Sequence, residues 1–222
     1  NIAAANELLD KSFARITPDE YRRKRESELR KEREAARASS TSPVGDLILT
    51  TVSSTTSTNE EIEQTVATQV NQEMNEAQTF YRQDKEGKVL ALRLVTANTQ
   101  EYQQAARLIA GFWQEIGIRT SVELIESKDI SRTALKARNY DVLLYGMILG
   151  GDPDQFPFWH STQINFPGLN LARYVNRSAD ALLEKMRGTA DEPELAGLAQ
   201  KFQELILKEE KQRILLKFSI KK

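Results

Sequence analysis

Short apolar runs alternate with amphipathic stretches over the second half of the chain. Residues 89–95, 120–125 and 141–148 are typical of strands, because they are short and rich in β-branched or aromatic side chains. Between them, residues 98–117 and 127–138 carry the apolar spacing of one helical face. This alternation predicts an α/β fold in which helices cover the faces of a sheet.

The same half of the chain contains two more helical patterns. Residues 178–187 and 192–208 are predicted helices, and residues 214–220 are a last strand candidate that would return to the sheet. We therefore expect residues 89–208 to form a three-layer lobe, with residues 140–148 as the central strand of its sheet.

The first half of the chain has weaker apolar patterns. Residues 2–13 show the spacing of a short amphipathic helix. A second helix is predicted over residues 58–82, where Thr58 and Glu61 have the spacing of a capping box. Its narrow apolar stripe is made by Ile62, Val66, Val70, Met74 and Ala77. Such a stripe indicates a helix packed on its own domain or, alternatively, a helix that docks on a partner or forms a coiled coil.

Charged and hydroxyl residues dominate the segment between these two helices. Residues 19–37 mix both signs of charge and favour a solvated helix or an extended linker, while residues 39–58 are rich in Ser and Thr and include a possible strand at 46–53. Both stretches carry little apolar area, so we expect them to be more mobile than the lobe, with only the stripe at 62–77 docked. A net charge of -1 and the interspersed acids argue against a nucleic-acid partner.

The most informative stretch of the chain is residues 140–161, YDVLLYGMILGGDPDQFPFWHS, which combines a strand pattern with a loop pattern. Its apolar run ends in glycines and Pro153, which a strand interior does not tolerate. A buried strand therefore delivers the chain to a tight loop that presents Asp152, Asp154, Trp159 and His160.

The sequence contains few residues that could act in catalysis or bind a metal ion. Cysteine is absent and His160 is the one histidine, so disulfides, cysteine-based zinc sites and His-rich metal sites are excluded within one chain. His160 is too near Asp154 and Ser161 in sequence for a catalytic triad, and indicates a buried polar position or a cleft lining. Asp152 and Asp154 suit paired carboxylates or calcium, but the rest of an EF-hand spacing is missing, which favours one of them as a cap of the next turn.

Several segments together resemble family 5 of the extracellular solute-binding proteins, the peptide and nickel receptors of ABC importers. The resemblance covers residues 90–210 and includes FWQEIGIRTSVELI, LNLARYVN and SADALLEKM, besides the strand that opens on Tyr-Asp and leads to Asp-Pro-Asp. It implies one lobe of a type II periplasmic-binding-protein-like fold, three-layer αβα. Residues 1–24 then begin the lobe, 25–85 are a helical and low-complexity insertion, and 86–222 form the ligand-binding lobe.

The resemblance also implies a function. Members of this family bind a peptide or similar small solute between two lobes, dock on an ABC permease in the membrane and catalyse nothing. We therefore expect an extracytoplasmic, monomeric receptor without a cofactor, anchored through a part of the protein that precedes residue 1. The alternative is a docking or scaffold module built on the same lobe.

Site residues follow from the same resemblance. In peptide binders of the family, an aspartate just after the strand's glycine pairs with the free amine of the ligand, but residues 147–151 hold no acid and Met147 stands where many members carry tryptophan. A small shift of the loop would let Asp152 take over this role. The expected ligand-binding residues are Met147, Leu149, Gly150, Asp152 and Trp159, with Asp154 and His160 as neighbours.

Overall fold

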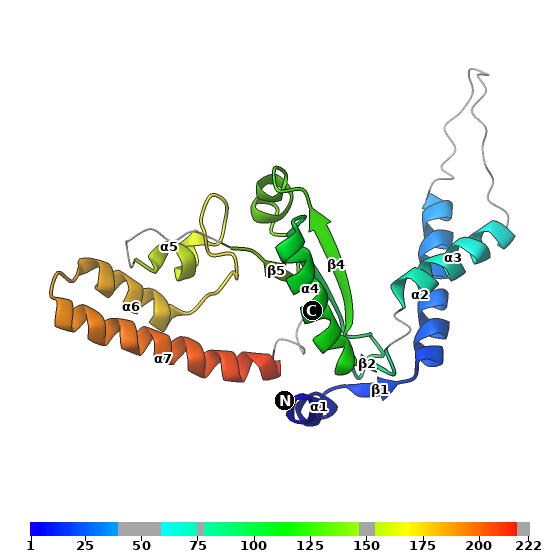
Figure 1. Ribbon diagram of the computed structural model, residues 1–222, viewed down its shortest axis with the longest axis horizontal. Coiled ribbons are helices and arrows are strands. Elements are labelled where there is room, and N and C mark those ends of the chain that lie inside the picture. The colour runs from blue at the N-terminus through cyan, green and yellow to red at the C-terminus, as the bar shows by residue number, and fades with distance from the viewer. Residues whose placement is uncertain (40–58, 75–77, 147–153, 217–222) are drawn as a thin grey trace, which may run out of the picture. The chain divides into compact units, whose positions relative to one another are not determined.

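The computed structural model describes residues 1–39, 59–74, 78–146 and 154–216 (Figure 1). The chain divides into two compact units, one of residues 1–91 and 112–119, the other of residues 92–111 and 120–222. The boundary falls within helix α4 (Gln100–Glu115), whose last turn belongs to the first unit.

The second unit is built on a three-stranded sheet in the order β4-β3-β5. Its strands are β3 (Ala91–Ala97), β4 (Arg119–Ile125) and β5 (Val142–Leu144), and β3 and β5 run parallel. Val95 and Ala97 pack with Ile130 and Ala134, while the alternate residues of β3, Leu94 and Thr96, are also buried. A sheet buried on both faces and followed by helices confirms the predicted α/β class.

The position of β5 differs from the sequence-based prediction. Residues 141–148 were expected to form the central strand, but β3 lies in the middle of the three described strands and β5 pairs with β3. Val142–Leu144 are half-buried, whereas the end of β3 is fully buried. An unbroken apolar run indicates burial but does not distinguish a strand with two neighbours from a strand with one.

Helices complete the second unit. Its predicted helices correspond to α4, the short π-helix η1 (Ser131–Lys136), α6 (Arg177–Gly188) and α7 (Glu192–Leu216), with α6 and α7 side by side in Figure 1.

The prediction of a strand at 214–220 is wrong for residues 214–216, which continue α7. Residues 217–222 lie outside the described part of the chain. The run KEEKQRILL consists of good helix formers, so nothing stops the helix at residue 208.

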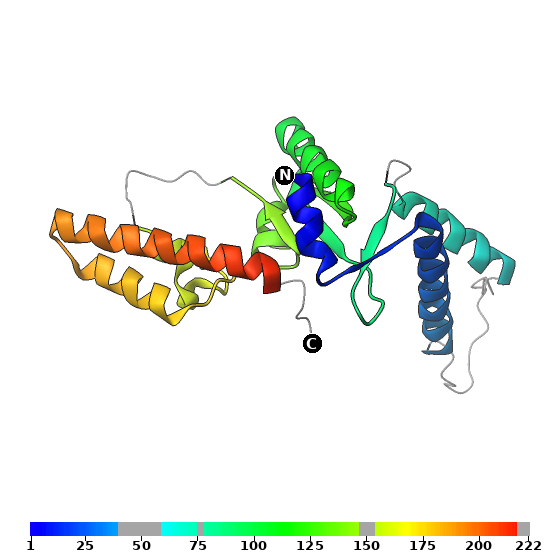
Figure 2. The ribbon, with the colours of Figure 1, turned by 90° about the horizontal axis from the view of Figure 1, so that it is seen from below.

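Among the described residues, the first unit contains three helices and a small two-stranded sheet. Its elements are α1 (Ile2–Asp10), β1 (Ala14–Ile16), α2 (Pro18–Ser39), α3 (Asn59–Glu73) and β2 (Tyr81–Gln83). Strands β1 and β2 are antiparallel, with Ile16 opposite Tyr81. Helices α2 and α3 cross and pack against each other, as both views show (Figure 2).

Helix α2 corrects the expectation that only the stripe at 62–77 docks. Leu29 of α2 is buried in one cluster with Val66 and Val70 of α3. Tyr21, near the start of α2, stacks on Tyr81 with the ring centroids 4.0 Å apart. Two large apolar side chains of this highly charged helix therefore pack on apolar surface that α3 and β2 supply. The strand expected at 46–53 lies outside the described residues.

Helix α3 ends earlier than predicted. It was expected to reach residue 82, but it ends at Glu73, and β2 begins at Tyr81. The Glu73 carboxylate accepts hydrogen bonds from Arg25 at 2.8 Å and lies 3.1 Å from the Arg119 guanidinium. Tyr81, seven residues after Met74, is already paired in the sheet with Ile16 of β1, so the chain has left the helical conformation by that point. The packing of α3 on α2 agrees with the interpretation of a helix packed on its own domain.

Arg82 is the main polar node of the first unit. Its side chain is 0% exposed and donates to the Ile116 carbonyl at 2.7 Å, to Asp10 at 2.7 Å and to Asn6 at 2.8 Å. The turn after α4 comes close because Gly117 has a φ of +83° and a Cβ there would meet the Phe80 ring. Arg82 thus joins α1, β2 and the end of α4.

Asp10 gives this node a pH dependence. Hydrogen bonds from Arg15 and Arg82 lower the pKa of Asp10 from 3.8 to about 2. A lowered pKa means that the folded state prefers the carboxylate, so this contribution to stability is complete above about pH 4 and is lost as the pH falls towards 2. We expect the stability difference between the natural protein and Asp10→Asn to be constant above pH 4 and to shrink below it. Denaturant unfolding of both proteins from pH 7 to pH 2 checks this, and a difference that does not change with pH would contradict it.

Candidate functional site

The candidate region begins at the carboxyl end of β5. Gly146 follows the strand, and a Cβ at this position would collide with the Tyr102 hydroxyl, so the backbone passes tightly against α4. Four of the predicted site residues, Met147, Leu149, Gly150 and Asp152, lie outside the described residues. The described chain resumes at Asp154, which with Trp159 and His160 forms the part of the predicted site that the structure describes.

Asp154 is held by two elements. Its Oδ1 accepts a hydrogen bond from the Phe156 backbone N–H at 3.0 Å, at the start of helix α5 (Phe156–Trp159). Its Oδ2 lies 2.7 Å from Nη2 of Arg187, on α6. Asp154 therefore caps the following turn, as one of the two sequence alternatives predicts, and also fastens that turn to α6.

The Phe156 ring is in contact with the His160 ring and with the Arg187 guanidinium. The His160 ring stacks on it with the centroids 4.0 Å apart, and the Arg187 guanidinium carbon lies 4.1 Å from its ring centroid. Stacking on an aromatic face suits a planar guanidinium, and the ion pair with Asp154 holds that guanidinium in place. This stack fixes α5 against the end of α6.

His160 occupies a buried polar position, 5% exposed. Its Nδ1 is 2.8 Å from the Thr162 hydroxyl, and its Nε2 faces Asp180 and Glu184 of α6 at 3.8 Å and 3.4 Å. Ser161 donates its backbone N–H to Asp180 at 2.9 Å. Ser161 and Asp154 thus have other partners, and His160 serves to dock the segment after α5, including helix η2 (Ser161–Gln163), on α6.

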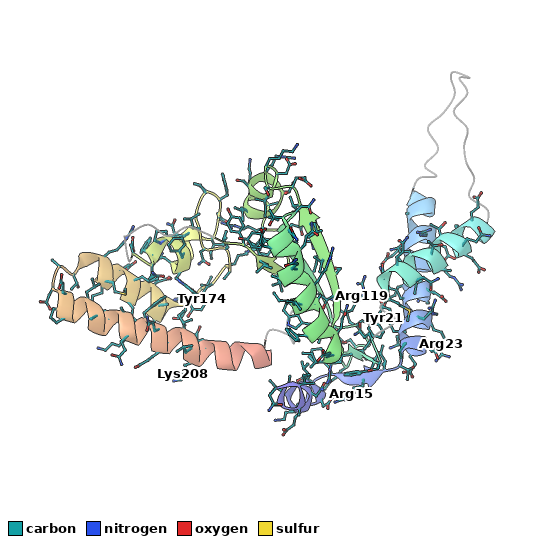
Figure 3. The ribbon with its side chains drawn as sticks, viewed as in Figure 1. Arg15, Tyr21, Arg23, Arg119, Tyr174 and Lys208 are labelled. Carbon is teal, nitrogen blue, oxygen red and sulfur yellow. The ribbon has the colours of Figure 1, made fainter. Side chains whose placement is uncertain are left out.

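Trp159 belongs to both a core and an open surface. It contacts Tyr174 and Phe202 edge to face, with centroid distances of 5.7 Å and 6.0 Å. Tyr174, labelled in Figure 3, is buried in the same cluster as Leu183 of α6. Another part of Trp159 lines a groove of about 900 Å³ between α5, α6 and α7. Trp159 is therefore a structural residue that also presents surface to this groove.

Asn170 is a key residue that the sequence analysis missed. It is 0% exposed, and its amide nitrogen lies within hydrogen-bond distance of the carbonyl oxygens of Trp159, His160 and Tyr174, at 3.2, 3.1 and 2.8 Å. Its amide oxygen accepts from the Tyr174 N–H at 2.9 Å. Asn170 thus closes the loop between α5 and α6. An asparagine between leucines in LNLARYVN was the available signal, because buried polar side chains need partners.

Tyr140 connects this loop to the sheet. Its hydroxyl donates to the Leu171 carbonyl at 2.8 Å, and Arg138 donates to the Gly168 carbonyl. The region around Trp159 is therefore anchored within the second unit at both α6 and the segment that leads into β5.

Two features that the described residues lack bear on the kind of site. No cluster of three or more His, Cys, Asp or Glu side chains arranged to hold a metal ion occurs among them. None of the helices in the described ranges has the length and apolar character to span a membrane.

The chain resembles the solute-binding receptors of ABC importers, as its sequence motifs predict. Among curated proteins it matches the oligopeptide-binding protein AppA of Bacillus subtilis strain 168, with 28% identity over 110 residues. The match covers 49% of this chain and 20% of the relative, so the chain spans about a fifth of that protein. No family model matches the chain.

Similar solved structures belong to receptors of the same kind. AppA from Bacillus subtilis, in complex with a nonapeptide, has a TM-score of 0.49 and 23% identity, covering 63% of this chain and 28% of that one. DppA from Helicobacter pylori, in complex with the peptide STSA, has a TM-score of 0.47 and 25% identity, covering 52% and 23%. NikZ from Campylobacter jejuni, in complex with Ni(L-His), has a TM-score of 0.49 and 22% identity, covering 55% and 25%.

Proposed function

We propose that this chain is one lobe of the substrate-binding component of an ABC importer and binds a peptide or a similar small solute. The observation that carries the proposal is the sequence match to an oligopeptide-binding protein over 110 residues. The α/β architecture with a glycine-rich segment after β5 supports it. In open α/β sheets, ligands bind at the carboxyl ends of the strands.

The ligand contacts in this proposal come from the segment after β5. Met147, Leu149, Gly150 and Asp152 follow directly on the carboxyl end of that strand. Trp159 contributes an aromatic surface. Asp154 and His160 support them, because their side chains are bound to α6 or face it. Asp152 supplies the charge for a ligand amine, since Asp154 is already paired with Arg187.

The partner and the location follow as parts of the same proposal. A receptor of this class delivers its solute to an ABC permease in the membrane and works outside the cytoplasm. It needs no cofactor and performs no catalysis, because affinity for the solute is its whole task. We propose that it acts as a monomer.

Mass spectrometry of small molecules that copurify with the natural full-length protein tests this function. We expect peptides to be released on denaturation and to bind again in calorimetry, while an unrelated protein purified in the same way releases none. If no solute copurifies and no peptide mixture gives a calorimetric signal, the receptor function is wrong and a docking module becomes the better hypothesis.

A further inference from the structure

The groove between α5, α6 and α7 has an apolar lining with a polar rim. Its apolar surface comes from Trp159, Met186, Leu195, Phe202, Ile206 and Leu207. Leu207, one of these lining residues, is 59% exposed. Such a surface gains free energy when an apolar group covers it.

The volume of the groove limits what can fill it. At about 900 Å³ it lies within the range of about 300–1,000 Å³ that small-molecule sites occupy. A second copy of the chain would need a complementary face that buries about 1,200 Å² or more in total for a stable interface. A hollow between three helices instead suits a few protruding side chains.

The charges at the rim cancel each other. Asp154 and Arg187 both line the groove and are bound to each other at 2.7 Å. Arg187 is further held on the Phe156 ring. A charged group entering the groove would lose its hydration and meet a pair that is already neutralised, so its burial would be costly. Gln203, an exposed residue that also lines the groove, can exchange hydrogen bonds with a peptide backbone.

We propose that this groove binds bulky apolar side chains of a peptide ligand and so makes the receptor selective for apolar over charged peptides. The inference rests on the proposed function and deepens it. The groove differs from the segment after β5, because its lining comes from the helical part of the second unit, 154–207.

Ala199→Phe is the direct test, because Ala199 lines the groove and a phenylalanine there would fill it. Ala196→Phe is the matched control, since Ala196 is an exposed residue of the same helix that does not line the groove. Calorimetry on the natural full-length protein uses three probes, namely trileucine, trilysine and triaspartate. We expect trileucine to bind about tenfold or more tightly than the charged peptides.

The variants separate the groove from the receptor function. Ala199→Phe should weaken trileucine binding about tenfold or more, and Ala196→Phe should change it less than about twofold. If Ala199→Phe proves unfolded by circular dichroism, Leu207→Ser at the exposed rim replaces it, with an expected loss of about fivefold.

Equal binding of trileucine to the natural protein and the groove variants would overturn the groove proposal and leave the receptor function standing. If none of the three probes binds the natural protein, the groove proposal falls, while peptides that copurify would still support the receptor function. A dimer in light scattering that Ala199→Phe dissociates would show that a second copy fills the groove.

Discussion

Replacing Asn170 by aspartate is expected to lower the free energy of unfolding of the second unit by about 3 kcal/mol or more. The substitution keeps the shape of the side chain but removes the amide donor. A carboxylate would then face the carbonyl oxygens of Trp159, His160 and Tyr174 in a position with no exposure to water. Denaturant unfolding followed by far-ultraviolet circular dichroism measures the loss.

The same substitution at Asn165 provides the control. Asn165 lies in the same loop but is exposed, so Asn165→Asp should change the free energy of unfolding by less than about 0.5 kcal/mol. If the two variants were equally stable, the amide of Asn170 would not be what closes the loop.

Arg82→Met should destabilise the first unit by about 3 kcal/mol or more. Methionine preserves much of the apolar stem but leaves the Ile116 carbonyl and Asn6 without their donor. Hydrogen exchange of the backbone amides of α1 and β2 reports on this unit by itself. We expect faster exchange in both elements.

Arg15→Met separates the effect of burial from that of charge. Arg15 binds the same carboxylate of Asp10 at 2.7 Å, but its side chain is 46% exposed. An exposed ion pair contributes about 1 kcal/mol or less, so this variant should exchange nearly as slowly as the natural protein. An Arg15 variant as unstable as the Arg82 variant would show that the number of charges around Asp10, rather than the burial of Arg82, determines the stability.

The helices and strands of the second unit could largely be predicted, because their patterns are local. The apolar face of α4 ends at Gly117, a residue that the positive φ of the turn requires, and β4 was predicted within one residue of its observed bounds. Helix α6 begins after Asn176, whose side chain accepts from the N–H groups of Ser178 and Ala179. Signals of this kind are carried by neighbours in sequence.

The docking of α2 could not be predicted, because it depends on partners distant in sequence. Tyr21 meets Tyr81, and Arg25 meets Glu73. In the sequence, Tyr21 and Leu29 are isolated apolar residues among charges, a pattern that is also typical of a solvated helix. The early end of α3 has the same cause, since the apolar spacing continues through Met74 while the pairing of β2 on β1 requires the helix to stop.

The candidate site was predictable in part. The sequence predicts that either Asp152 or Asp154 caps the next turn, and in the structure Asp154 accepts the Phe156 N–H there. Its ion pair with Arg187 joins residues 33 positions apart, so no local pattern indicated it. His160 has the buried position that one of its two sequence interpretations predicts. The ligand-binding roles of these residues, and of Met147, Leu149, Gly150 and Asp152, stay predictions.

The turn at the end of α4 also has a consequence for protein synthesis. The carbonyl of Ile116 and the backbone at Gly117 complete the surroundings of Arg82 and Phe80, yet they are translated about thirty residues later. At about 5–20 residues per second, a ribosome takes a few seconds to supply them. Until then the nascent first unit holds a guanidinium without one of its acceptors. A polypeptide that stopped at residue 91 would therefore lack both the Ile116 acceptor of Arg82 and the backbone that packs on Phe80.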